Sequence, residues 1–102
     1  MNPFGEKLRY HRLRCRDPLS GRPLSQFRLG ELLGDVLGDN GFSGVTISNW
    51  ENGKTHIVAS ERPVLCAIVQ VLFVHNGLES PEEANAMLTA GDYRQLDASE
   101  TA

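Results

Sequence analysis

The sequence predicts an all-α fold of five helices in a single domain. Three observations favour this fold. Apolar residues recur at helical spacing, serine and proline stand at the expected helix starts with glycine at the ends, and only residues 64–74 have a composition that a strand would also show. The chain has 102 residues, close to the common size of one domain, and its 40% hydrophobic and 23% charged residues are typical of a globular protein.

The first predicted helix begins at Pro3 and ends at about Cys15. Asn2 is the expected N-cap, and proline is favoured at the first helical position. The helix must end before Pro18, because the residue before a proline avoids the helical region. Residues 16–24 hold two prolines and a glycine and therefore form a loop.

The second predicted helix is capped by Ser25 and ends at about Leu37. Glycine and asparagine at residues 38–41 break it. Its apolar face should be buried, as expected for a helix on the surface of a globular domain. That face consists of Leu29, Leu32, Leu33 and Val36.

The third predicted helix is short, spans residues 44–51 and is capped by Ser43. Ile47 and Trp50 are three residues apart and face the core, where Phe42 joins them. Asn52 and Gly53 end the helix, since both residue types tolerate positive φ.

Residues 64–74 are almost continuously apolar and β-branched, as in a buried strand. We interpret them as a helix because Ser60 can cap it, Pro63 lies in its first turn, and a lone strand would leave its backbone groups unpaired. Being apolar on nearly all sides, this helix should be the most buried element.

The fifth predicted helix starts at Ser80, followed by proline and, at the third helical position, Glu83. This pattern is that of a capping box. The helix ends near Gly91, after which Tyr93 and Leu96 fold back onto the core. Residues 97–102 should fray.

Charge is unevenly distributed along the chain. Residues 1–30 carry seven Lys and Arg against two Asp and Glu, whereas residues 31–102 carry three against eleven, for a net charge of −3. Clustered arginine is expected on a surface that faces phosphates, but a solvated helix face would show it too. The acidic remainder argues against binding polyanions indiscriminately.

Several classes of protein are disfavoured by the sequence. We expect neither a membrane span nor a signal peptide, because the longest apolar run is too short and no basic stretch leads into an apolar core, and the two cysteines suit reduced thiols in the cytoplasm. No acid–base partner accompanies Cys15 or Cys66, and His56 and His75 lack metal-ligand spacing. A partly buried, structural histidine is expected at His11. We therefore expect no enzymatic activity, no cofactor and no metal.

Several short segments resemble one DNA-binding family. They are FGEKLRYHR (4–12), LSQ (24–26), FS (42–43) and above all TISNWENGK (46–54). Over roughly residues 3–75 the chain resembles the Cro/C1-type helix-turn-helix family, also called XRE-like or lambda-repressor-like. The resemblance implies that residues 1–78 form a DNA-binding domain of a bacterial or phage transcriptional regulator. Residues 79–96 would then be a helical extension packed on this domain, and residues 97–102 a disordered tail.

In this reading the third helix enters the major groove of double-stranded DNA and reads sequence there. Asn49 can pair with the N6 and N7 edge of adenine, Val45 can pack on a thymine methyl group, and Ser48 can bond several bases. The base-reading set is Gly44, Val45, Thr46, Ser48 and Asn49. The resemblance and the helix N-termini give the phosphate-binding set as Ser25, Gln26, Ser43, Asn52, Lys54, Thr55, Arg9 and Arg14, with Arg16 and Arg22 in the loop.

The resemblance also implies a structural ion pair between Arg12 and Glu51. Three features depart from the family pattern: a long loop at 16–24, an extended turn at 34–42 that contains Asp35 and Asp39, and glycine at position 44. They leave open a second function, in which the same fold is a protein-interaction module of a larger regulatory protein. A homodimer formed through Met87 and Leu88, or further domains of a longer chain, are the other partners that stay open.

Overall fold

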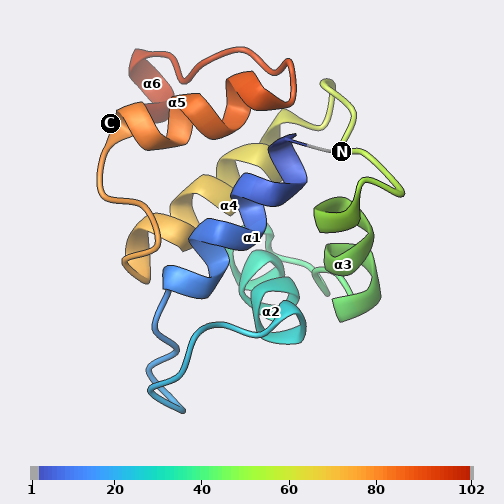
Figure 1. The fold of residues 1–102 in the computed structure, drawn as a ribbon, viewed down its shortest axis with the longest axis vertical. Helices are drawn as coiled ribbons and strands as arrows, with labels where there is room; N and C mark the ends of the chain where they lie inside the picture. The colour runs from blue at the N-terminus through green and yellow to red at the C-terminus, as the bar shows by residue number, and fades with distance from the viewer. Residues whose placement is uncertain (1–2, 102) are drawn as a thin grey trace.

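The computed structural model describes residues 3–101, which contain six α-helices and no strand. The prediction of an all-α fold is thus confirmed for this part of the chain, whereas Asn2, the predicted first cap, lies outside it. A sixth helix follows the five that the sequence predicts (Figure 1). The helices are α1 (Pro3–Arg14), α2 (Gln26–Leu37), α3 (Gly44–Asn52), α4 (Arg62–Val74), α5 (Pro81–Ala90) and α6 (Ala98–Thr101).

α4 runs through the middle of the molecule, with α5 and α6 across one end and α2 and α3 at the other (Figure 1). α1 packs against α3 and α5, while α2 packs against α3 and α4. The segment that could have been a strand is therefore the central helix. None of the described helices has the length and apolar character that crossing a membrane requires.

The core is made of the inward faces of α1 to α5. Met87 and Leu88 have no exposed surface, so these two residues fill the core and do not supply the dimer surface that the sequence left open. Val36, predicted on the buried face of α2, is 40% exposed. Fully buried side chains include Leu8, Leu24, Leu29, Leu33, Ile47, Leu65, Ile68, Leu72, Met87 and Leu88.

Serine caps start three of the helices. Ser25, Ser43 and Ser80 each accept a hydrogen bond from the backbone N–H three residues on, as the sequence predicts. The predicted cap at Ser60 is wrong, because α4 begins after Glu61, whose side chain makes no capping hydrogen bond. The predicted capping box is also incomplete, since Glu83 accepts from the N–H of Glu79 rather than from that of Ser80.

The extended turn between α2 and α3 folds back along α2. A Cβ atom on Gly30 would lie only 1.9 Å from the carbonyl oxygen of Phe42, so only glycine allows the turn this close. Gly41, in the turn, has a φ of 70°. The turn thereby seats the Phe42 ring edge-on against Trp50, at 4.9 Å between ring centroids.

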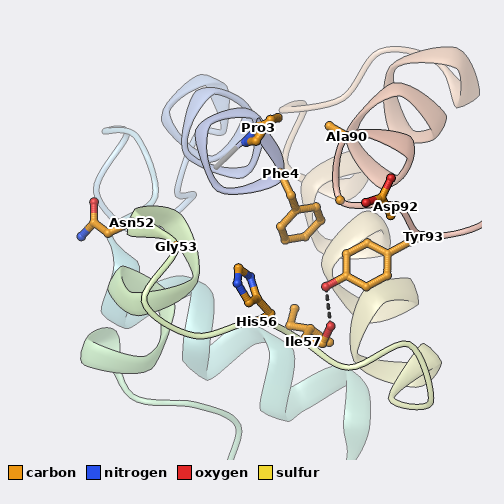
Figure 2. A pocket seen from close by; sticks show the side chains of 10 residues that line it. Pro3, Phe4, Asn52, Gly53, His56, Ile57, Ala90, Asp92 and Tyr93 are labelled. Atoms are coloured by element: carbon orange, nitrogen blue, oxygen red, sulfur yellow. Dashed lines mark hydrogen bonds between the residues drawn. The ribbon is translucent and has the colours of Figure 1, made fainter. Parts of the chain in front are cut away.

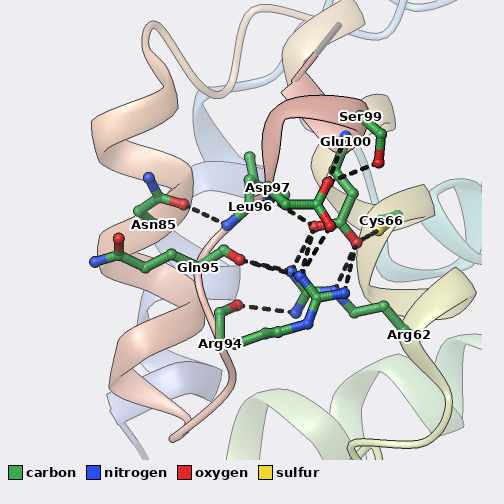
Figure 3. A network of polar contacts seen from close by, with 9 residues as sticks. All are labelled: Arg62, Cys66, Asn85, Arg94, Gln95, Leu96, Asp97, Ser99 and Glu100. Carbon is green, nitrogen blue, oxygen red and sulfur yellow. Dashed lines mark hydrogen bonds and ion pairs between the residues drawn. The ribbon is translucent and has the colours of Figure 1, made fainter.

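The end of the chain differs from the predicted frayed tail. α6 brings Glu100 against α4, where its carboxylate accepts hydrogen bonds from Arg62 at 2.8 and 2.9 Å and from the Cys66 thiol at 3.2 Å (Figure 3). Arg94 also pairs with this carboxylate, at 3.1 Å. Residues 98–101 are thus held in place by ion pairs, although residue 102 lies outside the described part of the chain.

Acid should weaken this C-terminal attachment. Hydrogen bonds from Arg62 and from the N–H of Asp97 hold the pKa of the Glu100 carboxyl far below its ordinary value of 4.5. A lowered carboxyl pKa stabilises the fold fully above pH 4.5, and this contribution is lost as the pH falls toward the folded-state pKa. We expect Glu100→Gln to lower the free energy of unfolding at pH 7, and the difference from the wild type to shrink as the pH falls below 4.5. Urea unfolding of both proteins across this range tests it, and an equal difference at every pH would contradict it.

Candidate nucleic-acid interface

α3 is fixed on its inner side by apolar packing. Ile47 has no exposed surface and Trp50 is 7% exposed, so neither side chain is available to a ligand. α1 approaches the end of α3 closely, because a Cβ on Gly5 would lie 2.4 Å from the carbonyl oxygen of Glu51. These contacts leave only the opposite side of α3 to face outward.

A buried ion pair joins α3 to α1. The Arg12 Nε donates to Glu51 Oε2 at 2.6 Å and its Nη2 to Oε1 at 3.0 Å, with the two side chains only 8% and 2% exposed. Arg12 also donates to the carbonyl oxygen of Leu24, and Gln26 Nε2 donates to Glu51 at 3.0 Å. The network therefore holds α1, α3 and the start of α2 in one arrangement.

The outer side of α3 carries four of the five residues predicted to read bases, whereas Gly44 faces the first turn of α2. Val45 is 70% exposed, and Asn49 is half-buried with no side-chain hydrogen bond to any residue in the described range 3–101. Ser48 accepts from Asn52 at 3.2 Å, and Thr46 lies 3.1 Å from the Ser43 hydroxyl. Gly44 is the fifth member of the set. Small or uncharged groups thus form this side, with one free amide near its middle.

The N-termini of α2 and α3 lie next to each other. A Cβ on Gly44 would be 3.3 Å from the backbone nitrogen of Phe27, in the first turn of α2. The capping residues Ser25 and Ser43 are both exposed. Each helix start carries a partial positive charge and free N–H groups, so the pair forms a region favourable to anions.

The other residues predicted to bind phosphate are placed unequally. Asn52, Lys54 and Thr55 are exposed at the end of α3, and Arg9 is exposed one helical turn before Arg12. Gln26 has one of its amide hydrogens committed to Glu51 and keeps the other. Arg16 and Arg22 are exposed in the loop that precedes α2.

Arg14 belongs to a different surface. It pairs with Glu79 at 2.7 Å and with Glu83 at 3.2 Å, and it stacks over the Tyr10 ring at 5.3 Å. The hydrogen bond with Glu83 raises the pKa of the Arg14 guanidinium. Because two carboxylates already compensate its charge on the α5 side of α1, we withdraw Arg14 from the set of phosphate contacts.

Two acidic residues, Asp35 and Asp39, belong to the extended turn region that departs from the family pattern. Asp39 accepts from the N–H of Gly41 at 2.7 Å and so shapes the turn, whereas Asp35 is exposed on α2. Near the start of α2, Arg28 pairs with Glu31 at 3.3 Å and with Asp17 of the preceding loop at 3.7 Å. Asp39 and Arg28 therefore have structural roles in and around α2.

Sequence reasoning missed one residue of this surface. Phe27 is 63% exposed, and its backbone lies beside Gly44 at the start of α3. Its position two residues before Leu29, off the buried face of α2, is the signal that could have found it.

The titratable groups elsewhere favour structural roles. Burial raises the pKa of the Cys15 thiol to about 11, and burial together with the Glu100 contact raises that of Cys66, so both thiols stay protonated at neutral pH. His11 is buried with Nδ1 2.9 Å from the carbonyl oxygen of Gly77, and burial lowers its pKa. Within residues 3–101, no three His, Cys, Asp or Glu side chains are grouped as a metal site would require.

Comparisons of this chain with protein-family models, with curated proteins and with solved structures find no match. The feature that points to a function is therefore the geometry of α3 and its surroundings. α3 is a short helix that is fixed on one side and open on the other, and its N-terminus lies next to that of α2.

Proposed function

We propose that this protein binds double-stranded DNA through α3, as a Cro/C1-type helix-turn-helix domain of a bacterial or phage transcriptional regulator. In this proposal α1 to α5 correspond to the five helices of the lambda-repressor-like domain. The observation that carries it is the contrast between the two sides of α3. Its inner side is buried through Ile47 and Trp50, while Val45 on its outer side is 70% exposed. A recognition helix needs this combination to enter the major groove.

The side chains divide into two roles in this complex. Asn49 pairs with adenine through its free amide, Val45 packs on a thymine methyl group, and Ser48 bonds base edges less selectively. The phosphate contacts on either side fix the position of the helix without reading sequence. They come from Ser25, Gln26, Ser43, Asn52, Lys54, Thr55 and Arg9.

The short polar side chains of α3 favour sparse base contacts. Specificity should then depend partly on DNA shape, because a protein can select sequences by the energy of deforming them. A regulator of this kind would work in the cytoplasm, where both free cysteines stay reduced.

Fluorescence anisotropy with duplex DNA at several salt concentrations tests the proposal. We expect binding that weakens with salt, with a slope of about −0.9 in log–log units for each phosphate contact. Absence of binding to any duplex at low salt would contradict it.

A second candidate function is a protein-interaction module that uses the same face. The observation that favours it is the exposure of two large apolar side chains in the adjoining first turns of α2 and α3, Phe27 at 63% and Val45 at 70%, because exposed apolar patches mark interaction sites. The excess of acidic residues beyond residue 30 is also compatible with it. This alternative predicts that no duplex binds, even at low salt.

A further inference from the structure

A cavity of about 550 Å³ lies between the start of α1, the segment after α3 and the end of α5 (Figure 2). The side chains of Phe4, His56 and Tyr93 point into it, whereas that of Asn52 points away. Phe4 and Tyr93 pack edge to face with ring centroids 5.2 Å apart, and the Tyr93 hydroxyl donates to the carbonyl oxygen of Ile57. The cavity therefore has walls fixed by internal contacts and a size suited to a small ligand.

Two helix carboxyl ends lie at the wall of this cavity. α3 is capped by Gly53 and α5 by Gly91, and both glycines line it. Each helix carboxyl end contributes partial negative charge there. Asp92 adds a full negative charge at the wall, and its carboxylate makes no hydrogen bond or ion pair with the described residues.

The charge of Asp92 is unfavourable at its position in the fold. Asp92 follows the carboxyl end of α5, where a negative charge is repelled by the helix dipole. Its φ of 61° lies in the left-handed region, which aspartate and asparagine adopt more readily than other residues with side chains, so the backbone itself is not strained. A charge placed against a helix dipole is expected where it serves a ligand.

We propose that this cavity is a binding site for a small organic cation, an amine carried on a compact aromatic or apolar body. The ammonium group lies at the rim that Asp92 and Tyr93 share, where a carboxylate and an aromatic ring both attract positive charge. The apolar body packs against Phe4 and Ile57. This site lies beyond the end of α3 and adjoins the proposed DNA surface only at Asn52, whose side chain points away from the cavity, so amine binding can be tested on the free protein.

An NMR titration of the free, ¹⁵N-labelled protein tests the proposal with three probes that share one aromatic body. They are 2-phenylethylamine, the neutral 2-phenylethanol and the anionic phenylacetate. We expect the amine to bind most tightly, with amide shifts confined to the cavity wall at Gly53, Ile57, Gly91 and Tyr93. Absence of such shifts at millimolar amine, or equal binding of alcohol or anion, would overturn the proposal.

The variant Asp92→Asn separates charge from shape in the same titration. Asparagine tolerates the left-handed region, so the fold should be kept, as the dispersion of the amide spectrum will show. We expect the affinity for 2-phenylethylamine to fall about fivefold, the size of one partly exposed ion pair. Asp35→Asn, an exposed acid on α2, is the matched control and should leave the affinity unchanged. Equal affinities of the two variants would overturn the role of Asp92.

Discussion

Glu51→Ala is expected to lower the free energy of unfolding by about 3–5 kcal/mol, because it leaves a buried guanidinium without its partner. Arg12 is 8% exposed and directs two nitrogens at this carboxylate, at 2.6 and 3.0 Å. Gln26 would lose its acceptor at the same time. Urea unfolding at pH 7 measures the change, which is a large part of the stability of a domain of this size.

Two further variants test whether burial is the cause. Glu31→Ala breaks an ion pair with Arg28 in which the glutamate side chain is 48% exposed, so we expect less than about 1 kcal/mol. The double variant Arg12→Leu with Glu51→Leu removes both charges and should be more stable than Glu51→Ala, since no charge is left uncompensated. If Glu51→Ala cost no more than Glu31→Ala, the structural role of the pair would be wrong.

Val45→Glu is expected to weaken DNA binding about a hundredfold, because it brings a negative charge to the surface proposed to face phosphates. Val45 is 70% exposed in the first turn of α3, so stability should change by no more than about 0.5 kcal/mol. Anisotropy titrations of both proteins with one duplex measure the change in affinity.

Val74→Glu is the matched control for this variant. Val74 is 66% exposed at the end of α4 and belongs to none of the elements proposed to contact DNA. We expect the control to reduce the affinity far less, through the change in net charge alone. Equal losses in the two variants would mean that α3 has no special position in the complex.

The sequence was sufficient to predict α2 and α3 because their limits are set locally. Ser25 and Ser43 satisfy N–H groups within their own first turns, and Gly53 takes the left-handed conformation that ends α3. Such signals depend on neighbours three or four residues away and can be read along the chain. The burial of Ile47 and Trp50 follows from their spacing in the same way.

Features that depend on distant residues could not be predicted from these patterns. α6 is held in place by the ion pair between Glu100 and Arg62, which lies 38 positions earlier in the chain. A helix of four residues has little stability of its own. Arg14 could be counted as basic from the sequence, but its pairing with Glu79 depends on how α5 packs against α1. The charged residues can be counted from the sequence, whereas the ion pairs that they form depend on the fold.

DNA binding through α3 is tested most sharply by a map of backbone amide shifts of the ¹⁵N-labelled protein, recorded during titration with a random-sequence duplex at low salt. The proposed function predicts shifts concentrated at residues 43–52 and at the start of α2, which diminish as salt is added. Shifts confined to α5 and α6, or an unchanged spectrum at saturating DNA, would contradict it.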